Sequence, residues 1–219
     1  MAGILVVISY LWIDRPVAVL AHDLIRSKAP VTALCTRLSA LPDLLTGLWM
    51  IIVLIAPVFL WAVTTSRITL RGRLQELSIA ACGSFLLSAT AKMLLKWTFG
   101  RTWPETWIYG NPSYIRDGVY GFFPLHGGAG WSSFPSGHMA AATTIAMIGW
   151  RYAPNLRPLW TIIAAGAAIG LVAMNFHFVS DVIAGGYIGM ASSAIATRMA
   201  ALWHRPVEAQ PVTAAAACP

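Results

Sequence analysis

The sequence predicts an all-α membrane protein, a bundle of about six transmembrane helices in a single domain. Of its 219 residues, 58% are hydrophobic and only 11% are charged, whereas soluble domains carry about 25% charged residues. Apolar runs recur along the whole chain, which excludes an ordinary soluble domain. We expect residues 1–205 to form one membrane domain with its core at 77–200, followed by a disordered Ala/Pro-rich tail at 206–219.

Runs long enough to cross a bilayer need about twenty apolar residues. The expected spans are residues 3–22, 44–64, 77–97, 138–152, 159–175 and 179–203. The first is marginal because Asp14, Arg15 and Pro16 interrupt it. Residues 24–42 mix basic and apolar side chains, which favours a segment lying along the membrane interface.

The connection at residues 98–137 is rich in aromatic residues, which favour the headgroup layer, so we expect it to pack on the membrane surface. Basic turns at residues 67–73 and 151–157 are typical of a cytoplasmic side. In this six-span arrangement of an inner (plasma) membrane protein, His138 and His177 face the periplasm or exterior.

The formal net charge of +7 does not indicate nucleic-acid binding, because the basic residues are scattered between apolar runs and form no stripe. Cys35, Cys82 and Cys218 are too far apart for a disulfide framework or a zinc site. No cleavable signal is evident at the N-terminus.

The first motif that can carry chemistry is Phe134-Pro135-Ser136-Gly137-His138, at the start of an expected span. Free backbone N–H groups at a helix start bind anions, a serine hydroxyl adds a donor, and Gly137 lets the backbone approach a ligand. His138 could protonate a leaving oxygen. The alternative is a serine N-cap followed by an interfacial histidine.

The second motif is His177 with Asp181, which share a helix face at this spacing. A carboxylate that accepts from one ring nitrogen leaves the other as nucleophile or base. The alternative is a histidine and a helix-cap aspartate paired for stability.

The third motif is Lys96 with Arg101 at the end of the 77–97 span. Such a pair can neutralise phosphate oxygens. It can equally extend to lipid phosphates.

Taken together, the motifs resemble those of the type 2 phosphatidic acid phosphatase family, whose pattern is K-x6-RP, PSGH and SR-x5-H-x3-D. The resemblance covers roughly residues 77–200. Two departures stand out: Trp103 occupies the arginine position of the first motif, and Gly170 and Leu171 occupy the serine and arginine positions of the third. We expect Arg101, and Arg116 from the aromatic connection, to replace these charges.

The resemblance implies a phosphatase acting on a membrane lipid phosphate. His177 would attack phosphorus to form a phosphohistidine, Asp181 would orient it, and His138 would protonate the leaving alcohol and then activate water. Lys96, Arg101, Ser136, Gly137 and Arg116 would hold the phosphate. No metal or other cofactor is expected.

Two alternatives to a phosphatase acting on a phosphatidate-like lipid remain open from the sequence. The substrate could be a polyprenyl diphosphate or a lipid A phosphate. The protein could also be a non-catalytic lipid-binding or transport protein whose site has lost its arginines. The residues do not indicate an oligomeric state.

Overall fold

The computed structural model describes residues 2–26, 55–56, 58–62, 65, 72–106 and 110–203. Its main elements are α1 (Ala2–Ile8), a π-helical turn (Ser9–Ile13), α2 (Asp14–Arg26), α4 (Gly72–Phe99), α5 (Tyr114–Asp117), α6 (Gly137–Tyr152), α7 (Arg157–Ala173) and α8 (Val179–Trp203). The described residues form helices and loops with no β-strand, which confirms the all-α prediction.

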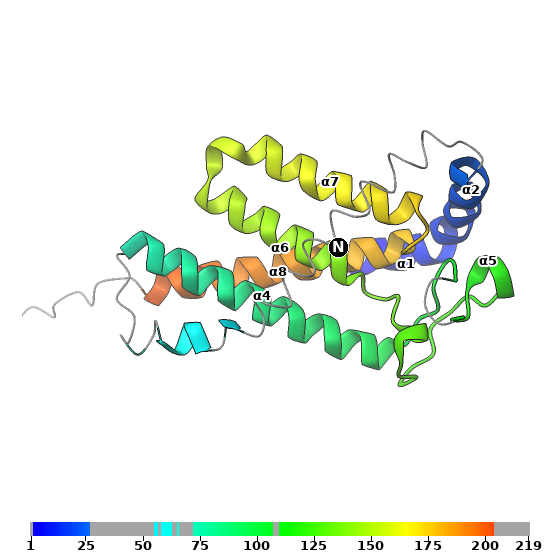
Figure 1. The fold of residues 1–219 in the computed structure, drawn as a ribbon, viewed down its shortest axis with the longest axis horizontal. Helices are drawn as coiled ribbons and strands as arrows, with labels where there is room; N and C mark the ends of the chain where they lie inside the picture. Colours follow the sequence, from blue (N-terminus) through cyan, green and yellow to red (C-terminus); the bar gives the residue numbers. More distant parts are fainter. Residues whose placement is uncertain are drawn as a thin grey trace, which may run out of the picture.

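α1 and α2 form one continuous helical run through the π-helical turn (Figure 1). The backbone N–H of Asp14 donates to the carbonyl of Ser9, five residues earlier, which widens the helix just before Pro16. The charged residues that interrupt the apolar run therefore do not end the helix. Asp14 is buried, whereas Leu5 and Trp12 are exposed, as on a lipid-facing surface.

α4, α6 and α8 pack against one another, and α6 also packs against α7. α6 and α7 form a hairpin whose connection lies at the far end of the bundle from α5 (Figure 1). Glycines bring α8 close to α6: a Cβ on Gly189 would lie 2.6 Å from the carbonyl oxygen of Ala140. A Cβ on Gly185 would collide with the carbonyl oxygen of Ser136, so the α6 start and the α8 start lie against each other.

Four helical runs of the described residues are long and apolar enough to cross a membrane: residues 2–23, 72–99, 154–173 and 179–203. They match four of the six expected spans. α6 has 16 residues, or about 24 Å at 1.5 Å per residue, which is shorter than the ~30 Å hydrocarbon core. Most of the expected 44–64 span and of the 24–42 interfacial segment lies outside the described residues, as does the 206–219 tail.

α4 ends at Gly100, which adopts a left-handed conformation with φ +49 and donates its N–H to the carbonyl of Lys96. A side chain at Gly100 would collide with the carbonyl oxygen of Phe123. The chain then runs through α5 and a short 3-10 helix, Ala129–Trp131, before it reaches α6. This glycine lets the connection fold back over the end of the bundle.

Candidate active site

His138 and His177 lie together although they come from different elements. His138 is the second residue of α6, and His177 lies just before α8. Their ring centroids are 6.0 Å apart. The structure therefore brings the two sequence motifs to one place, as the sequence predicts.

His177 is buried and faces the start of α8. Its Nδ1 lies 3.7 Å from Asp181 Oδ2 and 3.5 Å from Ser133 Oγ. Ser133 donates to the same Asp181 oxygen at 2.6 Å, and the backbone N–H of Phe178 donates to it at 3.0 Å. Burial lowers the pKa of His177, although Asp181 acts in the opposite direction, so the ring is neutral at neutral pH.

The turn between α7 and α8 fixes the backbone of His177. Its N–H donates to the carbonyl of Leu171, and the side chain of Leu171 packs against α6 and α8 in the core. Asn175 takes a left-handed conformation with φ 55, and its amide donates to the carbonyl of Ala18 in α2. The position of the missing family arginine is thus an apolar core position here.

A backbone hydrogen bond joins the start of α6 to Asp181. Ser136 is the N-cap: its Oγ accepts from the N–H of Met139 at 3.3 Å. The N–H of Ser136 donates to the carbonyl of Asp181 at 3.0 Å. The first N–H groups of a helix have no partner within the helix, so that of Gly137 can be offered to an anion.

Two lysines of α4 approach this helix start. Lys96 donates to the carbonyl of Ser132 and lies 5.8 Å from the Trp103 ring centroid. Lys92, one turn earlier, lies over Gly137: a Cβ there would be 2.9 Å from its Cδ and 3.6 Å from its Nζ. Sequence reasoning did not assign Lys92 to the site, although its spacing from Lys96 places both on one helix face.

The two lysines and the two imidazoles form one cluster of basic groups. The charges of Lys92, Lys96 and His177 all act on His138, and the charge of Lys92 acts on Lys96. Repulsion between such groups is relieved when an anion binds among them. The arrangement therefore suits a multiply charged anion such as a phosphate.

Arg101 lies behind this cluster and is fully buried. Its guanidinium donates to Asp181 Oδ1 at 2.5 Å, to Asp14 Oδ2 at 2.7 Å and to Ser180 Oγ at 2.6 Å. Burial acts to lower the pKa of Arg101, but the two carboxylates outweigh it and raise the pKa. These contacts favour a positioning role for Arg101, and its expected contact with phosphate stays a prediction.

Arg116 lies in α5 and is half exposed. It donates to Asp117 at 2.7 Å and to the carbonyls of Gly110 and Asn111. The hydrogen bond that Arg116 donates to Asp117 raises the pKa of Arg116. These described contacts all lie within its own loop, and its expected role in phosphate binding stays a prediction.

Trp103 occupies the position where the family pattern has an arginine. Its ring stacks obliquely on His177 with centroids 5.1 Å apart, and its Nε1 donates to the carbonyl of Ala129 at 2.9 Å. Trp103 therefore covers one side of the His177 ring and supplies no charge.

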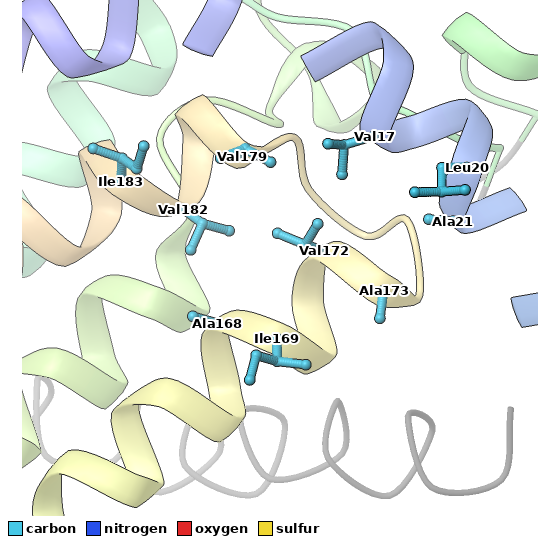
Figure 2. A pocket seen from close by; sticks show the side chains of 10 residues that line it. All are labelled: Val17, Leu20, Ala21, Ala168, Ile169, Val172, Ala173, Val179, Val182 and Ile183. Atoms are coloured by element: carbon cyan, nitrogen blue, oxygen red, sulfur yellow. The ribbon is translucent and has the colours of Figure 1, made fainter. Parts of the chain in front are cut away.

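An apolar groove of about 540 Å³ lies between α2, α7 and α8 (Figure 2). Val17 and Leu20 of α2, Val172 of α7, and Val182 of α8 are among its lining residues. Val179 and Val182 stand on either side of Ser180 and Asp181 in the sequence of α8, so the turn of α8 that carries Asp181 also contributes to the groove.

Comparisons with known proteins agree with the family that the sequence motifs resemble. The model of the PAP2 superfamily matches residues 77–205, more than half of the chain. The chain belongs to the PAP2 superfamily. The match includes every predicted catalytic residue but excludes α1 and α2.

Two curated relatives are both named lipid A 1-phosphatase. The one from Rhizobium etli is 31% identical over 126 residues, which are 53% of this chain and 50% of the relative. The one from Rhizobium johnstonii is 29% identical over 194 residues, which are 82% of this chain and 70% of the relative. The chain thus spans about half the length of the first relative, and no solved structure matches it significantly.

Proposed function

We propose that this protein is a membrane lipid phosphatase that hydrolyses a phosphomonoester through a phosphohistidine intermediate. The observation that carries the proposal is the 6.0 Å separation of the His138 and His177 rings, beside two lysines at a helix start. Membership of the PAP2 superfamily supports the same reaction class.

In the first step, the Nε2 atom of His177 attacks phosphorus. Its Nδ1 faces Asp181, which fixes the proton on that nitrogen and stabilises the positive charge that develops on the ring. The bond from phosphorus to the lipid oxygen breaks as the bond to nitrogen forms. A phosphate bound among the lysines would favour the protonated form of His138, which gives its proton to the departing oxygen.

In the second step, the now neutral His138 takes a proton from water as the water oxygen attacks phosphorus. The bond from phosphorus to His177 breaks, and inorganic phosphate leaves. Lys92 and Lys96, the Ser136 hydroxyl and the Gly137 N–H would hold the phosphate oxygens during both steps, a form of stabilisation worth several kcal/mol.

For the substrate, we propose the 1-phosphate of lipid A over a phosphatidate or a polyprenyl diphosphate. The names of the two relatives support this choice. An inner-membrane location with the site facing the periplasm or exterior is part of the same proposal.

The experiment is phosphate release by the detergent-purified protein from lipid A, phosphatidate and a polyprenyl diphosphate. We expect release from lipid A in the presence of a chelator, inhibition by vanadate, and no release by His177→Ala. His126→Ala is the matched control, because His126 lies outside the cluster and stacks on Trp131.

Three results would count against the proposal. Retained activity in His177→Ala would reject the mechanism. Release from another lipid alone would change the substrate. Binding of phosphorylated lipids without turnover would favour the non-catalytic alternative.

A further inference from the structure

We infer that Asp14, in the N-terminal helical run outside the family match, is a positioning residue of the active site that sets the charge beside His177. The inference rests on the proposed function, because it assigns Asp14 to the same reaction. It also gives Arg101 its role, which is to couple Asp14 to Asp181.

Asp14 is the centre of a buried hydrogen-bond network. Its Oδ2 accepts from Arg101 at 2.7 Å, from Tyr120 at 3.2 Å and from the hydroxyl of Ser180. Its Oδ1 accepts from the N–H of Ser180 at 2.9 Å. This last bond attaches the carboxylate directly to the first turn of α8, one residue before Asp181.

Arg101 extends the network to the catalytic carboxylate. One terminal nitrogen donates to Asp14 and the other to Asp181. Asp14, Arg101 and Asp181 are each at most 1% exposed, so solvent screens their interactions little. The orientation of Asp181 thus depends on a residue 167 positions earlier in the chain.

The charges of these three residues explain why a second carboxylate is needed. Arg101 alone would neutralise Asp181 and cancel its field at His177. With Asp14 the three groups carry a net charge of −1, which stabilises the positive charge that His177 acquires when it attacks phosphorus. A buried uncompensated negative charge is costly, and the adjacent reaction gives it a function.

Other charged groups near His177 act in the opposite direction. Lys96 from α4 and His138 from α6 disfavour positive charge on the ring, whereas Asp181 from α8 favours it. How readily His177 takes on positive charge therefore depends on how much of the negative charge of Asp181 is left after its pairing with Arg101. Asp14 determines that share.

The test compares Asp14→Asn, Asp14→Glu and the control Asp23→Asn, which changes an exposed carboxylate of the same helical run. Each variant is assayed in detergent with lipid A, or with short-chain phosphatidate if the wild type hydrolyses only that. The readouts are kcat, KM, the pH dependence of kcat/KM, and thermal stability.

We expect kcat of Asp14→Asn to fall about 10- to 100-fold, by analogy with the loss of groups that orient metal-ligating histidines, with KM nearly unchanged. Loss of the negative charge makes His177 harder to protonate, so the acid limb of its kcat/KM profile moves to lower pH. The acid limb of Asp14→Glu stays near that of the wild type, and Asp23→Asn behaves as the wild type.

The inference is overturned if folded Asp14→Asn keeps wild-type kcat. It is also overturned if the Asp14→Asn and Asp14→Glu variants lose activity only in proportion to their loss of thermal stability while the acid limb of kcat/KM stays in place. Such a result would mean that Asp14 has a structural role alone. Should the Asn variant fail to fold, Asp14→Ser, whose smaller hydroxyl can both accept and donate, is judged by the same readouts. Failure of the wild type to release phosphate would reject the proposed function instead.

Discussion

Lys92 lies directly over Gly137, the first residue of α6, with its Cδ 2.9 Å from the position that a Cβ of Gly137 would occupy. This contact places a second ammonium group at the helix start that also carries His138. The ammonium group of Lys92 can replace positive charge that the family pattern supplies through arginines at the positions of Trp103 and Leu171. We propose that Lys92 and Lys96 supply the positive charge there.

Replacing Lys92 by methionine tests this assignment. A hydrogen bond to a charged group contributes about 1.5–3 kcal/mol, so we expect kcat/KM to fall about 10- to 100-fold. Lys92→Arg should retain more activity because it keeps the charge. Arg198→Met, which removes an exposed charge from α8, is the control, and equal activities of Lys92→Met and Arg198→Met would disprove the role.

Gly185→Ala tests the contact that joins α8 to α6. The added Cβ would collide with the carbonyl oxygen of Ser136, and overpacking of this kind costs about 1–3 kcal/mol. We expect a lower melting temperature and weaker activity, because the two histidines move apart. Gly3→Ala, where a Cβ meets nothing within 4 Å, should leave both unchanged; a Gly185→Ala protein as stable and active as Gly3→Ala would contradict the close packing.

The protonation of His177 can be measured by NMR of histidine-labelled protein in detergent. Burial lowers the pKa of His177 below its ordinary value of 6.5. We therefore expect the resonance that disappears in His177→Gln to titrate below pH 6.5, so that the nucleophile is neutral at pH 7. Titration at or above pH 6.5 would mean that the ring is not desolvated as the structure has it.

The sequence was sufficient to predict the helical class and the meeting of His138 with His177. Both depend on local signals, namely apolar runs and motifs at helix starts. A place for Lys92 in the site could also have been predicted, since it lies one turn before Lys96 on the same helix face.

The contacts of Arg101 with two buried carboxylates could not be predicted in the same way. Its spacing indicates a phosphate ligand, but its partners Asp14 and Asp181 are 87 and 80 residues away, and no local pattern records contacts at such separation. Asp14 itself looks like a break in an apolar run. In the structure the π-helical turn before it keeps the helix continuous, and Asp14 is buried against Arg101.

The most direct test of the account is a rapid-quench experiment with lipid carrying a radiolabelled phosphate. His177 is predicted to become transiently labelled through an acid-labile, alkali-stable bond, and His138→Ala, which lacks the base for the second step, is predicted to hold the label longer. Turnover with no label on His177, or with label on another residue, would contradict attack by His177.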